Sequence, residues 1–320
     1  MNNFLDRIAV VTGGGTGMGR ELVRQLAAEG CHVAMCDVFP AAMTETKHLC
    51  DAAALAPGLR ITTHLADVSD RNQVERFRDS VAEQHATDRI HLLFNNAGIG
   101  GGGSLIANSR EEWDKTFGVC WGGVYETTRA FLPLLMRADQ GHIVNTSSVN
   151  GFWATLSPHI PHTAYSAAKF AVKGFTEALI TDLRLHAPHI KCSVVMPGHI
   201  GTPIVSNSRK VLTGSESDVL TPAQIAHFRT LFAGMGIDTA NLSDDQIETM
   251  THAWARDFEE KAPMTAAAAA AVILDGVKAE RWRILVGEDA KRLDAMVRSD
   301  PEAAYEAAFF ARLMSATPKS

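Results

Sequence analysis

A tyrosine and a lysine stand four residues apart, at Tyr165 and Lys169. On a helix this spacing places the phenol and the ammonium one turn apart on the same face. A free phenol has a pKa of about 10, so its use as a base near neutral pH requires a shift of about 3 units, or roughly 4 kcal/mol. A neighbouring ammonium favours the phenolate. The pair could therefore transfer a proton, although the same spacing also occurs by chance in surface helices.

Two hydroxyl groups precede this pair, at Ser147 and Ser148, where a strand-forming run of residues ends. A serine in this place could donate a hydrogen bond to a substrate oxygen as negative charge develops on it. Residues 197–202 (PGHIGT) follow the next strand-forming run. This segment could hold the far end of a bound ligand.

A glycine cluster, TGGGTGMG, occupies residues 12–19. It follows a β-branched run and leads directly into a helical pattern, so its backbone can turn tightly and approach a pyrophosphate at the N-terminus of the helix. Its G-x-x-x-G-x-G spacing differs from the general G-x-G-x-x-G fingerprint. Alone the cluster is weak evidence, because loops gather glycine for many reasons.

An acidic residue, Asp37, ends the next strand-forming run. A carboxylate there can accept hydrogen bonds from both hydroxyls of an adenosine ribose, and it would repel a 2′-phosphate. Neither Gly15, Thr16 nor Val38 offers a compensating basic side chain. The sequence therefore favours NAD over NADP, with a plain turn residue at a strand end as the alternative.

Two further polar clusters follow the third and fourth runs, at Asp67 with Val68 and at residues 95–98 (NNAG). Ligands bind at the carboxyl ends of strands in open α/β sheets. Asp67 suits the amino group of an adenine. The amides of the second cluster can brace the sheet around a tight turn.

Seven short β-branched runs have the pattern of buried parallel strands. Helical stretches such as residues 19–29 and 72–83 lie between them. This alternation predicts an α/β fold, a doubly wound parallel sheet of the Rossmann type in a single domain over residues 1–320. The predicted strands are residues 7–12, 32–37, 61–66, 90–95, 142–147, 190–196 and 283–286.

Residues 203–263 depart from this alternation of strands and helices. They contain helix starts near Thr221 and Ser243 and no strand pattern. About 60 residues make a poor separate core, so we expect a helical substrate lid inserted before the last strand rather than an independent domain. Its many apolar residues suit a fairly large apolar substrate, although apolar lid faces can also pack on the body. The tail, residues 299–320, is expected to be helical and to dock on the body or on a neighbouring subunit.

Composition excludes several classes of protein. The formal net charge is −6, whereas phosphate binding needs a basic face, so nucleic acid is not expected as a partner. The five cysteines form no CxxC pair, which predicts reduced thiols rather than disulfides or a metal site. No signal-peptide pattern and no membrane-length apolar run is visible, so we expect no membrane partner and a cytoplasmic location.

The TGxxxGxG, DV, NNAG, SS, YxxxK and PG motifs stand in one order along the chain. In this order they resemble the short-chain dehydrogenase/reductase family, classical type, over about residues 5 to 300. The resemblance implies an NAD-dependent oxidoreductase that interconverts a secondary alcohol and a ketone. It implies that Ser148 and Tyr165 hold the substrate oxygen and that Tyr165 is the general acid or base. Lys169 would bind the nicotinamide ribose and lower the pKa of Tyr165.

The cofactor site expected from these motifs draws on six segments of the chain, and the resemblance adds the carboxamide contacts of Ile200 and Thr202. No metal is expected. The cofactor-binding residues are then Gly13, Gly15, Thr16, Gly17, Met18, Gly19, Asp37, Val38, Asp67, Val68, Asn95, Ala97, Gly98, Tyr165, Lys169, Pro197, Ile200 and Thr202.

One departure from the family pattern lies in a proton relay. The family carries an asparagine in a W-x(6)-N context, and counting from Trp113 that position is Cys120. A thiol is a weak hydrogen-bonding group and cannot copy an amide. In the family the relay water is held by the backbone carbonyl at this position, which Cys120 still provides. We expect turnover to survive, and Cys120 to be a buried neutral thiol rather than a nucleophile.

A second departure is the long spacing between Ser148 and Tyr165, with the additional residues in 152–163. His159 and His162 in this loop have no acidic companion at metal-ligand spacing. We expect them to line the substrate mouth or to be exposed. Trp153 is expected either to form a wall of the substrate site or to pack on the protein.

Two other functions fit the sequence less well. An NAD-sensing or scaffold protein that kept the fold and lost turnover is the alternative, motivated by Cys120 and the enlarged loop; the complete set of Ser148, Tyr165 and Lys169 speaks against it. A sugar epimerase or dehydratase fits poorly, because those relatives have another glycine spacing and a larger C-terminal domain. Long predicted helices around residues 111–137 and 163–185 pair across two-fold axes in the family, so a homodimer or homotetramer is expected.

Overall fold

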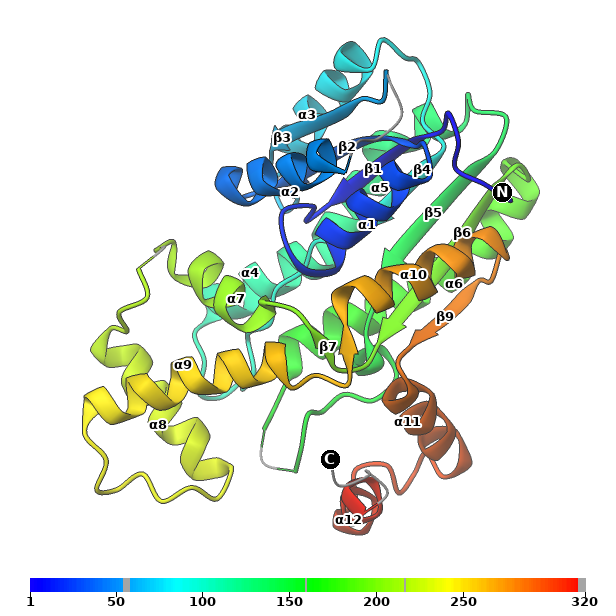
Figure 1. Ribbon diagram of the computed structural model, residues 1–320. Coiled ribbons are helices and arrows are strands. Elements are labelled where there is room, and N and C mark those ends of the chain that lie inside the picture. Colours follow the sequence, from blue (N-terminus) through cyan, green and yellow to red (C-terminus); the bar gives the residue numbers. More distant parts are fainter. Residues whose placement is uncertain (54–57, 159, 216, 316–320) are drawn as a thin grey trace.

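A computed structural model describes residues 1–53, 58–158, 160–215 and 217–315. Over these residues a seven-stranded parallel sheet forms the centre of the molecule, in the order β3-β2-β1-β4-β5-β6-β9 (Figure 1). Every predicted strand is present, and no strand end differs by more than two residues. The strands are β1 (Ile8–Thr12), β2 (His32–Asp37), β3 (Ile61–Leu65), β4 (Leu92–Asn95), β5 (Gly141–Thr146), β6 (Ile190–Pro197) and β9 (Arg283–Val286).

Helices cover both faces of this sheet, because successive side chains of a strand point to opposite faces. Val11 and Met35 belong to one hydrophobic core, and their neighbours Val10 and Ala34 belong to the other. The first core lies under α1 (Gly17–Ala28), α2 (Pro40–Ala52) and α10 (Ala266–Lys278). The second lies under α3 (Arg71–Gln84), α5 (Gly123–Leu135) and α6 (Thr163–His186).

Local capping fixes where several helices begin. The Asp70 carboxylate accepts hydrogen bonds from the backbone N–H groups of Asn72 and Gln73 at the start of α3. The hydroxyl of Thr265 accepts one from the backbone of Ala268 at the start of α10. Such caps satisfy N–H groups that have no partner within the helix.

The strands β1 and β4 lie side by side in the middle of the sheet, although β2 and β3 separate them in the chain. After β1 the chain continues toward one edge of the sheet, and after β4 it continues toward the other. The loops after these two strands therefore run in opposite directions and leave a space between them. A crevice at such a switch point is where open α/β sheets bind ligands.

The insertion between β6 and β9 is helical, as predicted. Helices α8 and α9 each begin with a capping box, built by Thr221 with Gln224 and by Ser243 with Gln246. Two-residue strands on either side of the insertion pair in parallel and close its base. The elements are β7 (Ile200–Gly201), α7 (Ile204–Thr213), α8 (Pro222–Gly234), α9 (Asp244–Glu260) and β8 (Met264–Thr265).

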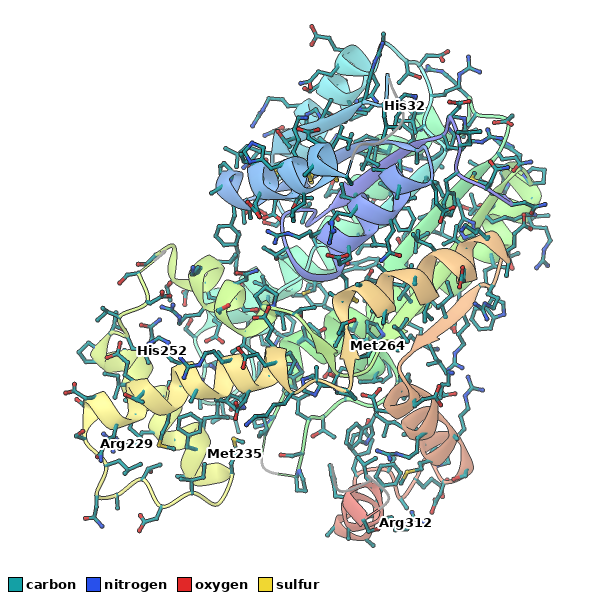
Figure 2. All side chains as sticks on the ribbon, viewed as in Figure 1. His32, Arg229, Met235, His252, Met264 and Arg312 are labelled. Carbon is teal, nitrogen blue, oxygen red and sulfur yellow. The ribbon has the colours of Figure 1, made fainter. Side chains whose placement is uncertain are left out.

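Helices α8 and α9 project from the body as a hairpin with a small core of its own (Figure 1). Phe228, Phe232 and Trp254 pack around this core together with buried Ile247. Arg229, which Figure 2 shows on the outer part of the hairpin, donates to the carbonyls of the loop that joins the two helices. Much of the apolar surface that suggested an apolar substrate is therefore used within the hairpin itself.

The C-terminal segment docks on the body, which was one of the two arrangements expected for it. Helix α12 (Ala307–Ser315) places Phe309 and Phe310 against Trp153, with ring centroids 5.9 and 5.3 Å from the indole. The indole N–H donates to the carbonyl of Ala304 at 2.8 Å, and Trp153 is 4% exposed. Trp153 therefore packs against the tail. The expectation that it forms a wall of the substrate site is wrong.

All five cysteines are buried and free of disulfides. Within the described residues, no helix has the length and apolarity needed to cross a membrane.

Candidate active site

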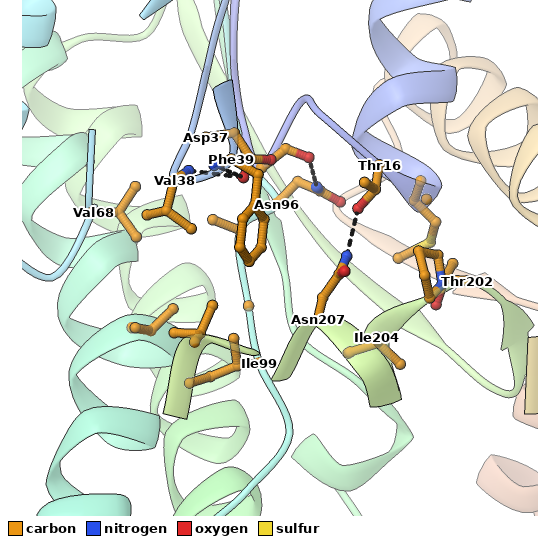
Figure 3. Close-up of a pocket in the computed structure, with 18 of the residues that line it drawn as sticks. Thr16, Asp37, Val38, Phe39, Val68, Asn96, Ile99, Thr202, Ile204 and Asn207 are labelled. Atoms are coloured by element: carbon orange, nitrogen blue, oxygen red, sulfur yellow. Dashed lines mark hydrogen bonds between the residues drawn. The ribbon is translucent and has the colours of Figure 1, made fainter. Parts of the chain in front are cut away.

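A cleft opens at the carboxyl ends of β1 to β4, with α7 beside it (Figure 3). It joins the loops that the motifs had marked along the chain. The expected cofactor-binding residues that line it are Gly13, Thr16, Gly17, Met18, Asp37, Val38, Asp67, Val68, Ala97, Gly98 and Thr202. The lining also includes Phe39, Asn96, Ile99, Val119, Ile204, Asn207 and Val211, to which the motifs assigned no cofactor contact.

The glycine loop after β1 leaves room for a ligand to approach the backbone. Gly17, at the start of α1, has a φ of +52°, a conformation that favours glycine. A side chain at Gly19 would overlap the carbonyl of Gly13. The Thr16 side chain does not cap α1; its hydroxyl accepts a hydrogen bond from Asn207 Nδ2 at 2.9 Å. The first turn of α1 holds no acidic residue, so its N–H groups suit a pyrophosphate.

The Asp37 side chain is fixed at the carboxyl end of β2. Its carboxylate accepts hydrogen bonds from the backbone N–H groups of Gly15, Val38 and Phe39 at 2.9, 2.8 and 3.1 Å. Burial raises the pKa of the Asp37 carboxyl, while these N–H groups and the Arg20 guanidinium act against the rise. The sequence pattern alone did not point to Arg20, which lies in the first turn of α1. The rigid carboxylate fits two ribose hydroxyls at this end of the cleft.

The Asp67 side chain also faces the cleft, but it has protein partners. Its carboxylate accepts hydrogen bonds from Lys115 Nζ at 2.6 Å and from the Ser69 hydroxyl at 2.6 Å. Burial pushes the pKa of Asp67 upward, and the bonds from Lys115 and Ser69 outweigh it, so the pKa lies below its ordinary value. Asp67 is therefore an anion at neutral pH, and contact with an adenine amino group stays a prediction.

The two adjacent asparagines after β4 have different roles. Asn95 is 2% exposed, and its amide is used in a buried network, donating to Asn145 Oδ1 at 2.7 Å and accepting from the Thr127 hydroxyl at 2.5 Å. It braces the sheet as predicted, but its side chain does not line the cleft. Asn96 does line it; its Nδ2 donates to the Thr12 carbonyl at 3.1 Å, and its Oδ1 is buried without a partner among the described residues.

Ser148, Tyr165 and Lys169 come together beside the cleft. Ser148 follows β5, and its side chain hydrogen-bonds the Tyr165 phenol. Helix α6 presents Tyr165 and Lys169 on one face, with Lys169 Nζ 5.3 Å from the centre of the phenol ring. Lys169 Nζ also donates to the Thr146 carbonyl at 2.8 Å. The structure thus brings together the three side chains that the sequence motifs selected.

The protonation of Tyr165 and Lys169 is set mainly by burial. Burial raises the pKa of Tyr165, as does the electrostatic effect of Cys120, while the hydrogen bond from Ser148 lowers it. Burial also lowers the pKa of Lys169. The sequence argument expected the lysine to lower the tyrosine pKa, and the net direction in the protein's own environment is the opposite. The phenol therefore rests in its protonated form.

Gly98 connects the trio with the cleft. It lines the cleft, and a side chain there would lie 3.5 Å from Lys169 Nζ and 3.7 Å from Cys120 Sγ. Among the other expected residues, Thr202 lines the cleft, Ile200 is 4% exposed in β7, and Pro197 ends β6. The carboxamide contacts expected from Thr202 and Ile200 stay predictions.

The family model for short chain dehydrogenases matches residues 7–212. The protein named oxidoreductase SadH from Mycobacterium tuberculosis is 30% identical over 298 residues, which cover 93% of this chain and 92% of that protein. The chain belongs to the short-chain dehydrogenase/reductase family. Levodione reductase from Leifsonia aquatica is 34% identical over 212 residues, 65% of this chain and 75% of that protein. A family member from Burkholderia phymatum, solved in complex with NAD, has a TM-score of 0.74 at 28% identity and covers 94% of this chain and 96% of its own.

Cys120, which stands where the family carries an asparagine, lies in a π-helical turn. This turn, Gly118–Gly122, connects α4 (Arg110–Phe117) with α5. Such turns widen a helix and recur at functional sites. Cys120 in this turn is fully buried, and its thiol donates to the Ile99 carbonyl at 3.1 Å. The thiol is therefore buried and hydrogen-bonded, as expected. Gly98 lies next to both this thiol and the Lys169 ammonium.

The second departure is the long loop before α6. His162 lies against the catalytic tyrosine expected in this family, with a ring-centroid distance of 4.6 Å and an interplanar angle of 36° to Tyr165. Burial lowers the pKa of His162 to about 4. His159, the other histidine of the loop, lies outside the described residues. Among the residues that the structure describes, no three His, Cys, Asp or Glu side chains gather as metal ligands would.

Proposed function

We propose that this short-chain dehydrogenase/reductase is an NAD-dependent oxidoreductase that interconverts a secondary alcohol and a ketone, with Tyr165 as general acid and base. The observation that carries the proposal is the trio of Ser148, Tyr165 and Lys169 beside a cleft that Asp37 lines, with Gly98 between the trio and the cleft. A dehydrogenase needs both a proton-transfer group and a dinucleotide site. The levodione reductase similarity and the NAD complex of a solved relative agree with both.

The roles of the side chains follow from their places. NAD would supply the acceptor for the hydride that leaves the carbinol carbon. Ser148 would hold the substrate oxygen, and Tyr165 would take the hydroxyl proton in oxidation and return it in reduction. The buried Lys169 ammonium favours the phenolate when the proton leaves. A protonated resting phenol is the form that reduction of a ketone requires.

The preference for NAD rests on Asp37. Its carboxylate is oriented by three backbone N–H groups and would accept hydrogen bonds from the ribose hydroxyls. A 2′-phosphate would meet this anion at short range. Arg20 reduces the repulsion, so discrimination against NADP is expected to be partial rather than absolute.

The substrate is proposed to be apolar over much of its surface, bounded by the lid helices of residues 203–263. Ile204 and Val211 on α7 line the cleft, whereas the large rings of α8 and α9 pack on one another. A homodimer or homotetramer is proposed through α5 and α6, where Tyr125 and Phe170 are 41% and 42% exposed. Aromatic side chains are enriched in the cores of such interfaces.

The decisive variant is Tyr165→Phe, measured against a panel of secondary alcohols with NAD⁺ and NADP⁺ and the matching ketones with NADH. Loss of the proton donor should lower kcat by about 100-fold or more, while NADH binding, followed by fluorescence, stays within about threefold. Tyr125→Phe on the exposed face of α5 is the matched control and should keep wild-type rates.

Two results would count against the proposal. Wild-type turnover by Tyr165→Phe would remove the phenol from the mechanism. Tight NADH binding by the wild-type protein with no turnover of any alcohol or ketone would favour the NAD-sensing alternative. Equal efficiency with NAD⁺ and NADP⁺ would contradict the role given to Asp37.

A further inference from the structure

The imidazole of His162 is held in contact with the Tyr165 ring. The backbone around it is pinned, because the N–H groups of Thr163 and Ala164 donate to the carbonyls of Gly103 and Gly102 at 2.8 and 3.0 Å. The Thr163 hydroxyl donates to the same Gly102 carbonyl at 3.1 Å. The position of His162 is thus a fixed feature of the start of α6.

No hydrogen bond within the described part of the chain engages the ring nitrogens of His162, and its side chain is only partly buried, so a ligand can reach them. Burial also keeps the imidazole neutral at physiological pH, since it lowers the pKa to about 4. A neutral imidazole has one N–H donor and one acceptor nitrogen. Polar groups with restricted access to water gain stability when a ligand satisfies them.

Two simpler roles do not account for this placement. A general base near neutral pH needs a pKa near the working pH, and that of His162 is too low. A purely packing ring beside Tyr165 would be served as well by Phe or Leu, which place no polar atoms at this site. The imidazole beside the phenol is suited to receive an uncharged oxygen of the substrate.

We propose that His162 is a substrate-binding residue that hydrogen-bonds a second oxygen of the substrate. This inference rests on the proposed function and narrows its substrate class. Because the two ring centroids lie 4.6 Å apart, a small substrate whose reacting oxygen is held by the Tyr165 phenol can bring a second oxygen within reach of the His162 imidazole. The second oxygen therefore lies on a carbon one or two positions from the reacting carbon, as in a hydroxy ketone, a diketone or a diol.

A pair of ketones that differ only in this oxygen tests the proposal. 2-Hydroxycyclohexanone and cyclohexanone are each reduced with NADH by the wild-type protein and by two variants. His162→Phe keeps the stacked ring and removes the nitrogens, whereas His162→Asn keeps hydrogen-bonding groups and removes the ring. Thermal unfolding and NADH binding show that each variant is folded and loads cofactor.

The wild-type protein should prefer the hydroxy ketone by about tenfold in kcat/KM, the scale of one well-formed hydrogen bond. His162→Phe should lose about tenfold more efficiency on the hydroxy ketone than on cyclohexanone, mainly through KM, and His162→Asn should retain part of the preference. Equal losses on the two ketones, or no preference in the wild-type protein, would overturn the role of His162. Failure of the wild-type protein with every ketone would instead contradict the proposed function.

Discussion

At the scale of single residues, the environment of Tyr165 decides its resting state. Burial of the phenol outweighs the hydrogen bond from Ser148, so its pKa is raised. Burial has the opposite effect on Lys169, whose pKa it lowers. Placing both groups in one buried pocket thus moves the two pKa values apart, because burial disfavours the charged form of each group. The protein environment by itself therefore holds the phenol in its protonated form.

The role of Cys120 is tested by Cys120→Ala. The thiol is fully buried and donates to the Ile99 carbonyl, so its removal should lower the free energy of unfolding by about 1–2 kcal/mol. If the relay uses the backbone carbonyl, kcat should fall by less than about threefold. Urea unfolding and steady-state kinetics measure the two effects separately.

A fall in kcat of about 100-fold in Cys120→Ala, with the protein still folded, would make the thiol itself part of the reaction. Cys192→Ala is a suitable control, since Cys192 is a buried thiol on β6 that donates to a backbone carbonyl away from Lys169.

At the scale of elements, α7 links the insertion to the cleft at the carboxyl ends of β1 to β4. Asn207 donates to the Thr16 hydroxyl at 2.9 Å, and the Ser208 hydroxyl accepts from the Gly100 backbone at 2.7 Å. These bonds tie α7 to the loops after β1 and β4. A helix held in this way can retain a ligand in the cleft and must move for its release.

Loss of one tie should weaken cofactor retention. Asn207→Ala is expected to raise the dissociation constant of NADH by about three- to tenfold, because one hydrogen bond contributes about 1 kcal/mol. Stopped-flow fluorescence should locate the change in the dissociation rate. Thr230→Val on the exposed face of α8, where the hydroxyl meets only its own helix, should leave the constant unchanged. An unaltered constant in Asn207→Ala would show that α7 does not retain the cofactor.

At the scale of the whole molecule, buried histidines make stability depend on pH. Burial lowers the pKa values of His64, His85, His91, His142 and His162 from 6.5 to about 4. As the pH falls below about 6.5, the unfolded chain binds protons before the folded chain does. Stability is therefore full above this pH and is lost progressively down to about pH 4.

The measurement is the urea midpoint of unfolding at pH 7.5, 6.5 and 5.5. We expect it to fall modestly between the first two values, because about half of the unfolded imidazoles are protonated at pH 6.5, and to fall more steeply at the third. A midpoint that stays constant down to pH 5.5 would show that these imidazoles are charged in the folded protein.

The sequence by itself determined the sheet, the glycine loop and the order of the strand-end motifs. A strand buried on both faces must be a short, nearly continuous apolar run, so the seven strands were visible without knowledge of their neighbours. The spacing of Tyr165 and Lys169 followed from the helical repeat. These features can be recognised from patterns of residues that are close in sequence.

Only the tertiary structure decided what side chains from distant segments meet. It separated Asn95, which turns into the buried network, from Asn96, which faces the cleft, because successive residues of an extended chain point in opposite directions. In the folded protein, Trp153 packs against the tail and His162 lies against Tyr165. Packing between remote parts of the chain selects such partners, and no local pattern encodes that selection.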